Sequence, residues 1–266
     1  MVTGLSSLTN LNSLVLEFES PQSLPDRETR HPPTRPILPA LTHIHFKGDI
    51  EYLEDLVARI DAPLLNDLTI SSFNQSEISA PQFVQFYSRT PGLKARSEAR
   101  VTFDSHFARI TLPPLTFCSR KLCVVILHAE SYQQRSFLER ICTLFLPSIF
   151  ALEDLYIYED PRGHSSLHVN YFENTRWFEI LCLFTAVKNL YVSKGFTEHF
   201  AHALQGLVSG GMTQVLPNLR ELFLESPSAW PQESGPIWVG IEQFIAVRQS
   251  SGFPVALSHW ERNYLK

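Results

Sequence analysis

The sequence has few cysteines and lacks targeting segments. Four cysteines occur in 266 residues, at Cys118, Cys123, Cys142 and Cys182, and none forms a Cys-x-x-Cys pair. This spacing excludes a zinc ribbon and a disulfide framework, and it predicts reduced thiols in an intracellular protein, cytoplasmic or nuclear. The N-terminus has no basic segment before an apolar one, and no apolar run reaches the roughly eighteen residues of a membrane span. We therefore expect no membrane partner.

An excess of charge of either sign is also absent. The chain has 22 Lys and Arg against 27 Asp and Glu, so its formal net charge is −5. Because these charges are spread evenly, the sequence predicts no nucleic-acid partner. Apolar residues make up 44% of the chain and aromatic residues 12%, which is enough to build a sizeable core and excludes disorder for most of its length.

The motifs of the common enzyme classes are missing as well. The chain contains no GxSxG, GxxxxGK[ST], GxGxxG after a strand or HExxH motif. In the segment Glu198 to His202 the two histidines are three positions apart with the glutamate outside them, which is the wrong geometry for a zinc protease. His164 and His168 have no cysteine pair upstream at the distance that a zinc finger needs. We therefore expect no catalytic residue, cofactor or metal, and an enzyme with an unfamiliar site is the most distant alternative.

What the sequence does contain is a recurring Leu-x-x-Leu-x-Leu pattern with aliphatic variants. Its copies lie at Leu11/Leu14/Leu16, Leu41/Ile44/Phe46, Leu65/Leu68/Ile70, Leu122/Val125/Leu127, Leu152/Leu155/Ile157, Val187/Leu190/Val192 and Leu219/Leu222/Leu224, with a degenerate copy at Leu93. Successive copies begin 24 to 35 residues apart. Such a period is typical of repeat proteins in which each unit stacks on the next.

Each copy ends in an alternating apolar stretch typical of a strand buried on one face, and segments of helical period lie between several copies. One such segment runs from Ile50 to Ile60, with Asp49 as its N-cap; others include Phe200–Val208 and Ile241–Ile245. We therefore predict an α/β fold, an irregular leucine-rich-repeat solenoid of parallel strands with helices on the convex side, forming a single domain over residues 1–266. The alternative is an ordinary α/β domain whose buried strands merely resemble one another.

Two segments interrupt the repeat of about eight units. Residues 21–36 contain five prolines and few apolar residues, which predicts a mobile loop. Residues 93–112 are expected to form a degenerate, hairpin-like unit with two strands, Arg100–Phe103 and Ala108–Leu112, joined by residues 104–106.

Several longer phrases carry a family resemblance. They are LPALTHIHFKGDIEYLEDLVARIDAPLLNDLTISSFNQ, SRTPGLKARSEARVTF, LEDLYIYED, FTAVKNLYVSKGF and VLPNLRELFLE. Together they resemble the leucine-rich-repeat region of the fungal, agaric-type family of F-box proteins. The resemblance implies a substrate receptor of a ubiquitin ligase, in which an F-box docks on the adaptor Skp1 and the repeats hold an unknown target protein.

The sequence departs from this family in two ways. The Asn or Cys that usually follows Leu-x-Leu is missing, since Leu16 and Leu224 are each followed by glutamate. No F-box is recognisable either, because the segment Leu24-Pro25-Asp26-Arg27-Glu28 continues into Thr-Arg-His-Pro-Pro instead of an apolar helix. Skp1 binding is therefore implied only by family analogy and is not expected for this chain alone. A free-standing scaffold unrelated to ubiquitin is the alternative function.

The repeat also predicts a candidate protein-binding surface. If the leucines of Leu-x-Leu point inward, the intervening residues form an exposed ladder. The ladder consists of Val15, His45, Thr69, Ile126, Tyr156, Tyr191 and Phe223, and the next outward positions are Glu17, Lys47, Ser71, His128, Tyr158, Ser193 and Glu225. The protein-binding residues that we predict are Tyr156, Tyr158, Tyr191, Phe223, Asp154, Asn189, Glu221 and Glu225. Clustered exposed aromatics are typical of binding hot spots.

Two alternatives concern the residues of this ladder. A C-terminal element could fold back and bury the rings as ordinary core, and Trp230, Trp238 and Trp260 are close enough in sequence to do so. His43 and His45 flank Ile44 and point to the same side of their strand, where we interpret them as surface histidines and not as a catalytic pair.

Overall fold

A computed structural model of the chain describes residues 8–18, 35–73, 80–94, 97–103, 107–113, 122–127, 151–159, 181–209, 215–225 and 236–261. The chain divides into two compact units, unit 1 with residues 1–95 and 109–129, and unit 2 with residues 96–108 and 130–266. The single domain expected over residues 1–266 stays a prediction. The predicted loop at 21–36 lies almost entirely outside the described residues.

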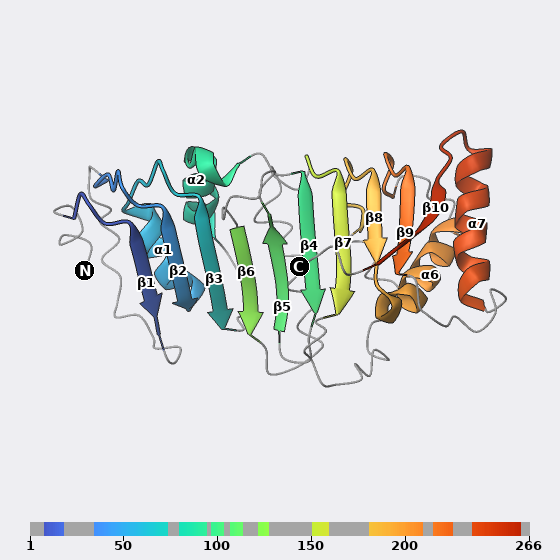
Figure 1. Ribbon diagram of the computed structural model, residues 1–266, viewed down its shortest axis with the longest axis horizontal. Helices are drawn as coiled ribbons and strands as arrows, with labels where there is room; N and C mark the ends of the chain where they lie inside the picture. Colours follow the sequence, from blue (N-terminus) through green and yellow to red (C-terminus); the bar gives the residue numbers. More distant parts are fainter. Residues whose placement is uncertain are drawn as a thin grey trace. The chain divides into compact units, whose positions relative to one another are not determined.

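Unit 1 is built on a row of parallel strands. Its strands are β1 (Ser13–Glu17), β2 (His43–Gly48), β3 (Asp67–Phe73), β6 (Leu122–Leu127) and, from Arg109 onward, β5 (Phe107–Leu112), in the order β1-β2-β3-β6-β5. The first four run parallel, and Ile44 lies opposite both Leu14 and Leu68. Strand β5 runs in the opposite direction to β6 (Figure 1). The alternation of buried and accessible side chains along β2 is the pattern expected of a strand with one covered face.

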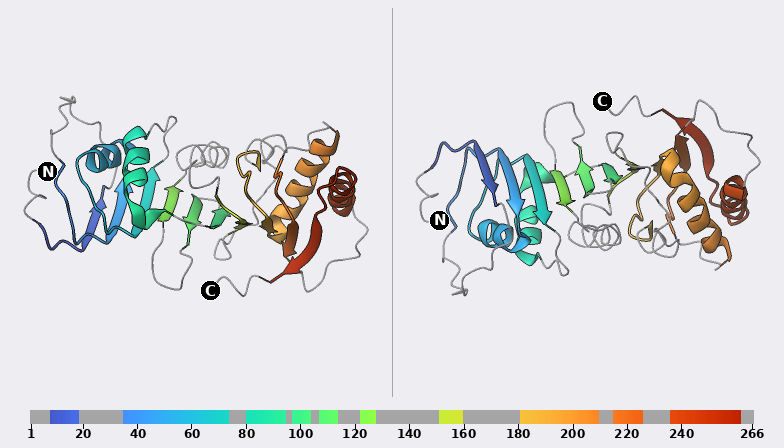
Figure 2. Two further views of the ribbon diagram at one scale, coloured as in Figure 1. Left: turned by 90° about the horizontal axis from the view of Figure 1, so that it is seen from above. Right: turned by 90° about the horizontal axis from the view of Figure 1, so that it is seen from below.

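Two helices, α1 (Ile50–Ala58) and α2 (Pro81–Arg89), lie side by side in unit 1 (Figure 2). The predicted N-cap of α1 is confirmed, because the Asp49 carboxylate accepts a hydrogen bond of 2.9 Å from the Glu51 amide. Helix α2 begins at Pro81, where a missing amide hydrogen costs nothing, and a short 3₁₀ turn, η2 (Pro91–Leu93), follows it.

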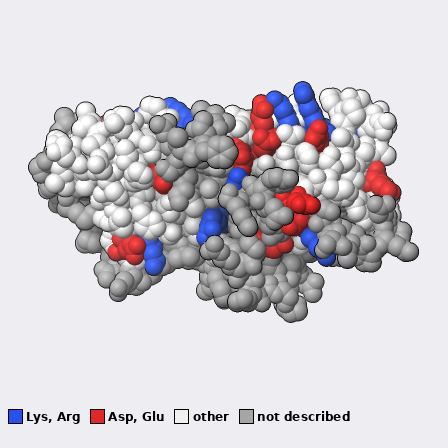
Figure 3. All heavy atoms as spheres, in the orientation of Figure 1, with Lys and Arg blue, Asp and Glu red and all other residues white. Residues whose placement is uncertain are grey.

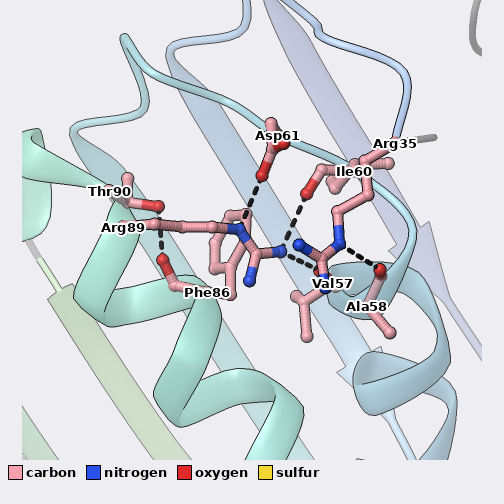
Figure 4. Close-up of polar contacts among 8 residues, drawn as sticks. All are labelled: Arg35, Val57, Ala58, Ile60, Asp61, Phe86, Arg89 and Thr90. Atoms are coloured by element: carbon pink, nitrogen blue, oxygen red, sulfur yellow. Dashed lines mark hydrogen bonds and ion pairs between the residues drawn. The ribbon is translucent and has the colours of Figure 1, made fainter. Parts of the chain in front are cut away.

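Charged side chains join α1 to α2. Arg89, at the end of α2, donates to the Asp61 carboxylate at 2.6 Å and to the Val57 and Ile60 carbonyls at 2.5 and 3.0 Å (Figure 4). Its guanidinium also lies over the Phe86 ring at 5.2 Å. The last carbonyls of α1 have no partner within their own helix, so Arg89 satisfies acceptors that the helix end leaves unpaired.

The other end of α2 is capped by α1. The buried Glu54 carboxylate accepts hydrogen bonds from the Gln82 and Phe83 amides at 3.0 and 2.7 Å. A negative charge at the amino end of a helix is favoured by the free amides and by the helix dipole. Contacts with α1 and the residues that follow it thus hold α2 at both of its ends.

Unit 2 contains a second row of parallel strands. They are β4 (Glu98–Phe103), β7 (Asp154–Glu159), β8 (Asn189–Val192), β9 (Glu221–Glu225) and β10 (Ala256–Trp260), in the order β4-β7-β8-β9-β10. Helices α6 (Lys194–Ser209) and α7 (Pro236–Ser250) contact each other, and α6 contacts β7 and β9. Leu155, Leu190 and Leu222 lie opposite one another on adjacent strands and are fully buried.

The predicted leucine-rich-repeat solenoid is wrong. The ten strands are mostly parallel but mixed, and only four α-helices accompany them within the described ranges. In a solenoid each unit lies beside the next one along the chain, whereas β3 is followed in space by β6, and β4 pairs with β7. The expected strands of the degenerate unit are present as β4 and β5, and the three residues between them leave no room for a crossover helix.

Candidate protein-binding face

The strands of unit 2 align three aromatic side chains in one row on the face opposite the buried leucines. Tyr156 on β7 lies opposite Tyr191 on β8, and Tyr191 lies opposite Phe223 on β9. Alternation along each strand points these three side chains to the same side, away from Leu155, Leu190 and Leu222. We call Tyr156, Tyr191 and Phe223 the aromatic row.

The rings of the aromatic row form a continuous stack. The Tyr156 and Tyr191 centroids are 4.1 Å apart and those of Tyr191 and Phe223 are 4.3 Å apart, with 8° between the planes in each pair. All three side chains are half-buried. Rings held this way by strand pairing lose little conformational freedom when a partner covers their edges.

A guanidinium caps one end of the stack. Arg100 lies opposite Tyr156, and its Cζ is 5.8 Å from the centre of the Tyr156 ring. Its Nε donates to the Glu98 carboxylate at 2.5 Å. Sequence reasoning missed both residues, because Ala99 and Val101 replace the leucines that mark the pattern elsewhere. Their signal is the alternation of buried and accessible positions around Arg100, which matches that around Tyr156.

The other end of the stack meets the C-terminal strand. Ser258 lies opposite Phe223, so the row of rings stops there. Two residues further on, the Trp260 ring leans back over Tyr156 and Tyr191, at centroid distances of 5.9 and 5.7 Å and nearly perpendicular to both. Its Nε1 donates to the Val192 carbonyl at 3.2 Å, and the side chain is 8% exposed.

The predicted alternative, in which a C-terminal tryptophan covers the rings, is thus partly realised. Trp260 packs on two of the three rings, whereas Trp238 belongs to α7 and is itself buried. Trp230 lies outside the described residues. Tyr191 is the only ring in contact with Phe223 among the parts of the chain that the structure describes.

Polar residues form a second row beside the aromatic row, two positions earlier on each strand. Glu98, Asp154, Asn189 and Glu221 lie opposite one another in that order, and Ala256 follows on β10. The Asn189 side-chain amide donates to the Asp154 carboxylate at 2.7 Å. This acidic row holds three carboxylates, and Arg100 forms an ion pair with one of them. On the face that Figure 3 shows, both acidic and basic side chains lie over the strands of unit 2.

Burial raises the pKa of both phenols of the stack. It raises the pKa of Tyr156 far above its ordinary value, and the nearby Tyr191 and Glu98 raise this pKa further. Burial is also the main cause that raises the pKa of Tyr191. Neither hydroxyl ionises near neutral pH, so both act as hydrogen-bonding groups on an aromatic surface and not as bases or nucleophiles.

The remaining predicted site residues have other neighbours. Tyr158 is half-buried and lies opposite Thr102 on β4. The Glu225 carboxylate accepts a hydrogen bond of 3.0 Å from the Lys194 amide at the start of α6, which favours the helix as an acidic cap does. Glu225 therefore has a structural role, although it lies on the same strand as Phe223.

The ladder predicted for unit 1 is polar by comparison. Val15, His45 and Thr69 lie opposite one another on β1, β2 and β3. Val15 is 59% exposed, and the His45 Nε2 is 3.7 Å from a Glu17 oxygen. His43 is exposed and interacts with the hydroxyl of Thr42 at 2.6 Å. Both histidines lie on the surface, as predicted.

Among the described residues no group of three or more His, Cys, Asp or Glu side chains could hold a metal ion. The helices in the same ranges are all too short or too polar to cross a bilayer. The structure does not describe the side chains of six further positions that the sequence analysis named, Ile126, His128, His164, His168, Glu198 and His199.

Comparison with protein-family models, with curated proteins and with solved structures gives no match for this chain. The resemblance to the fungal F-box proteins therefore stays a prediction.

Proposed function

We propose that the chain binds a target protein through the aromatic row of unit 2, as the substrate-recognition part of an F-box-type ubiquitin ligase receptor. The observation that carries the binding proposal is the half-buried stack of Tyr156, Tyr191 and Phe223 beside the acidic row. The link to ubiquitin rests on the sequence resemblance alone. An intracellular location, cytoplasmic or nuclear, belongs to the same proposal.

The stack suits a binding role because it is rigid before a partner arrives. The Trp260 ring packs nearly perpendicular to Tyr156 and Tyr191, and Arg100 covers the outer face of Tyr156. A partner that buries the remaining ring surface has few side-chain rotations left to restrict. Aromatic residues with these properties account for much of the binding energy in protein interfaces.

Phe223 is the best residue for testing the proposal. Removing Tyr156 or Tyr191 would also remove the surface on which Trp260 packs, whereas Phe223 has a ring contact only with Tyr191 within the described parts of unit 2. We expect Phe223→Ala to keep its circular dichroism spectrum and to lose about 2 kcal/mol or more of binding free energy toward the target. Val15→Ala, which changes an exposed side chain of unit 1, is the matched control.

The experiment uses the three chains as baits in the same native lysate, with quantitative mass spectrometry as the readout. A protein that the wild type and Val15→Ala retain and Phe223→Ala loses supports the proposal, once the affinity difference is measured with the purified pair. If all three baits retain the same proteins, the aromatic row is not the binding surface. When a target has been identified, removing this protein from cells should lengthen the half-life of that target. An unchanged half-life would favour a scaffold unrelated to ubiquitin.

A further inference from the structure

The aromatic row ends differently at its two sides. At the β4 side the guanidinium of Arg100 covers the outer face of Tyr156 and pairs with Glu98. At the β10 side the residues opposite Phe223 and Glu221 are Ser258 and Ala256, which offer neither a ring nor a charge. One end of the stack is therefore closed by a cation, and the other end faces small side chains.

The residues around the β10 end have unused interaction capacity. Phe223 contacts one ring, on its Tyr191 side, among the described residues. Glu221 is half-buried and makes no ion pair or side-chain hydrogen bond within the same parts of the chain. Ala256 is exposed, so the space above it is open to solvent. Trp260 lies further along β10 and directs its ring toward Tyr191 and Tyr156.

The charge of this region favours a cation. The acidic row has three carboxylates, and the guanidinium of Arg100 is at its far end, beside Glu98. Lys188, which directly precedes Asn189, pairs with Glu153 at 2.6 Å. A guanidinium stacks well on an aromatic face and pairs with a carboxylate through two parallel hydrogen bonds.

We propose that an arginine side chain of the target protein stacks on the free face of Phe223, above Ala256 and Ser258, and pairs with the Glu221 carboxylate. This inference rests on the proposed function and adds the chemistry of the partner. The intramolecular contact of Arg100 with Tyr156 and Glu98 is the nearest precedent in the molecule, although there the carboxylate and the guanidinium belong to the same strand. A lysine would pair with Glu221 but would lose the planar stacking contact.

The test uses the whole chain with ¹³C-labelled phenylalanine and a short probe, acetyl-Gly-Arg-Gly-amide. The matched probe carries citrulline, which has nearly the same shape as arginine but no charge. We expect the arginine probe to shift the Phe223 ring signal, assigned with Phe223→Leu, and the citrulline probe to shift it far less. Glu221→Gln should weaken binding of the arginine probe by roughly fivefold, as for an ion pair at a partly accessible site.

Glu242→Gln, an equal loss of charge at an exposed position on α7, is the control and should leave the affinity unchanged. An unshifted Phe223 signal at millimolar probe would overturn the inference. Equal shifts with both probes, or equal losses in the two glutamate variants, would overturn it as well. If Phe223→Ala loses the captured target while Glu221→Gln keeps it at full affinity, the binding face stands and the arginine contact does not. If the probe binds as expected but no captured protein depends on Phe223, the contact stands and the proposed function fails.

Discussion

At the residue scale, the aromatic row shows how strand pairing turns scattered positions into one surface. Tyr156, Tyr191 and Phe223 are 35 and 32 residues apart in the chain, yet their rings stack within 4.3 Å because each lies at the same register position. Arg100 covers the outer face of Tyr156 at one end of the stack, and the Trp260 ring packs nearly perpendicular to Tyr191. Only the edges and one outer face are left for a partner.

Sequence reasoning found the three rings and named Trp260 among three tryptophans that could cover them, but it missed Arg100. The Leu-x-Leu phase identified Tyr156, Tyr191 and Phe223, since each lies between two large aliphatic residues. Arg100 lies between Ala99 and Val101, which are also buried, but alanine is too small to complete the pattern. The position of the Trp260 ring over Tyr156 and Tyr191 depends on long-range contacts with β7 and β8, which a local sequence pattern does not show.

The two phenols predict a dependence of stability on alkaline pH. Because burial raises the pKa of Tyr156 and Tyr191 in the folded state, folding favours the neutral phenols. That contribution is complete below the unfolded pKa of about 10 and is lost as the pH rises through the folded pKa values. We expect the urea midpoint to fall as the pH rises above about 10. The double variant Tyr156→Phe, Tyr191→Phe, measured by the same denaturation series, should show a smaller fall, and an equal fall in both chains would contradict the assignment to these tyrosines.

At the element scale, the predictions that succeeded rest on local chemistry. The helix behind Asp49 and the helix that contains Ile241 and Phe244 are present as α1 and α7. Helix α2 was missed, although Phe83, Phe86 and Tyr87 follow helical spacing and are buried. Strand β10 was also missed, because its exposed positions dominate the segment and only Trp260 is buried.

The buried leucines of unit 2 predict large losses of stability on truncation. Leu155 and Leu190 are fully buried on adjacent strands, so replacing either with alanine removes apolar contacts and leaves a cavity. We expect each variant to lose about 2–5 kcal/mol of unfolding free energy in urea denaturation. Leu257→Ala on β10, where the side chain is 37% exposed, should lose much less. A loss below about 1 kcal/mol for Leu155 or Leu190 would contradict their place in the core.

At the scale of the whole molecule, the repeat in the sequence predicted the strands but not their arrangement. Local periodicity reports that a segment is a strand with buried side chains, and it does not report which strand lies beside it. Which strand lies beside which depends on long-range pairing, and here β3 pairs with β6 while β4 pairs with β7. A solenoid was expected because the intervals between motifs were similar, and similar intervals do not require neighbours in sequence to be neighbours in space.

The family resemblance predicts a further property of the whole chain, its behaviour toward the adaptor Skp1. Docking of an F-box on Skp1 needs an apolar helical segment, and the only Leu-Pro sequence near an acid in the first part of the chain, Leu24-Pro25-Asp26, continues into a proline-rich stretch. Proline within a helix removes a backbone donor and clashes with the preceding turn. We therefore expect the 266-residue chain and purified Skp1 to elute separately in size-exclusion chromatography, under conditions in which a known F-box protein elutes with Skp1. A stoichiometric complex would show that these residues contain a divergent F-box, and variants in the segment from Leu24 to Pro33 would then locate it.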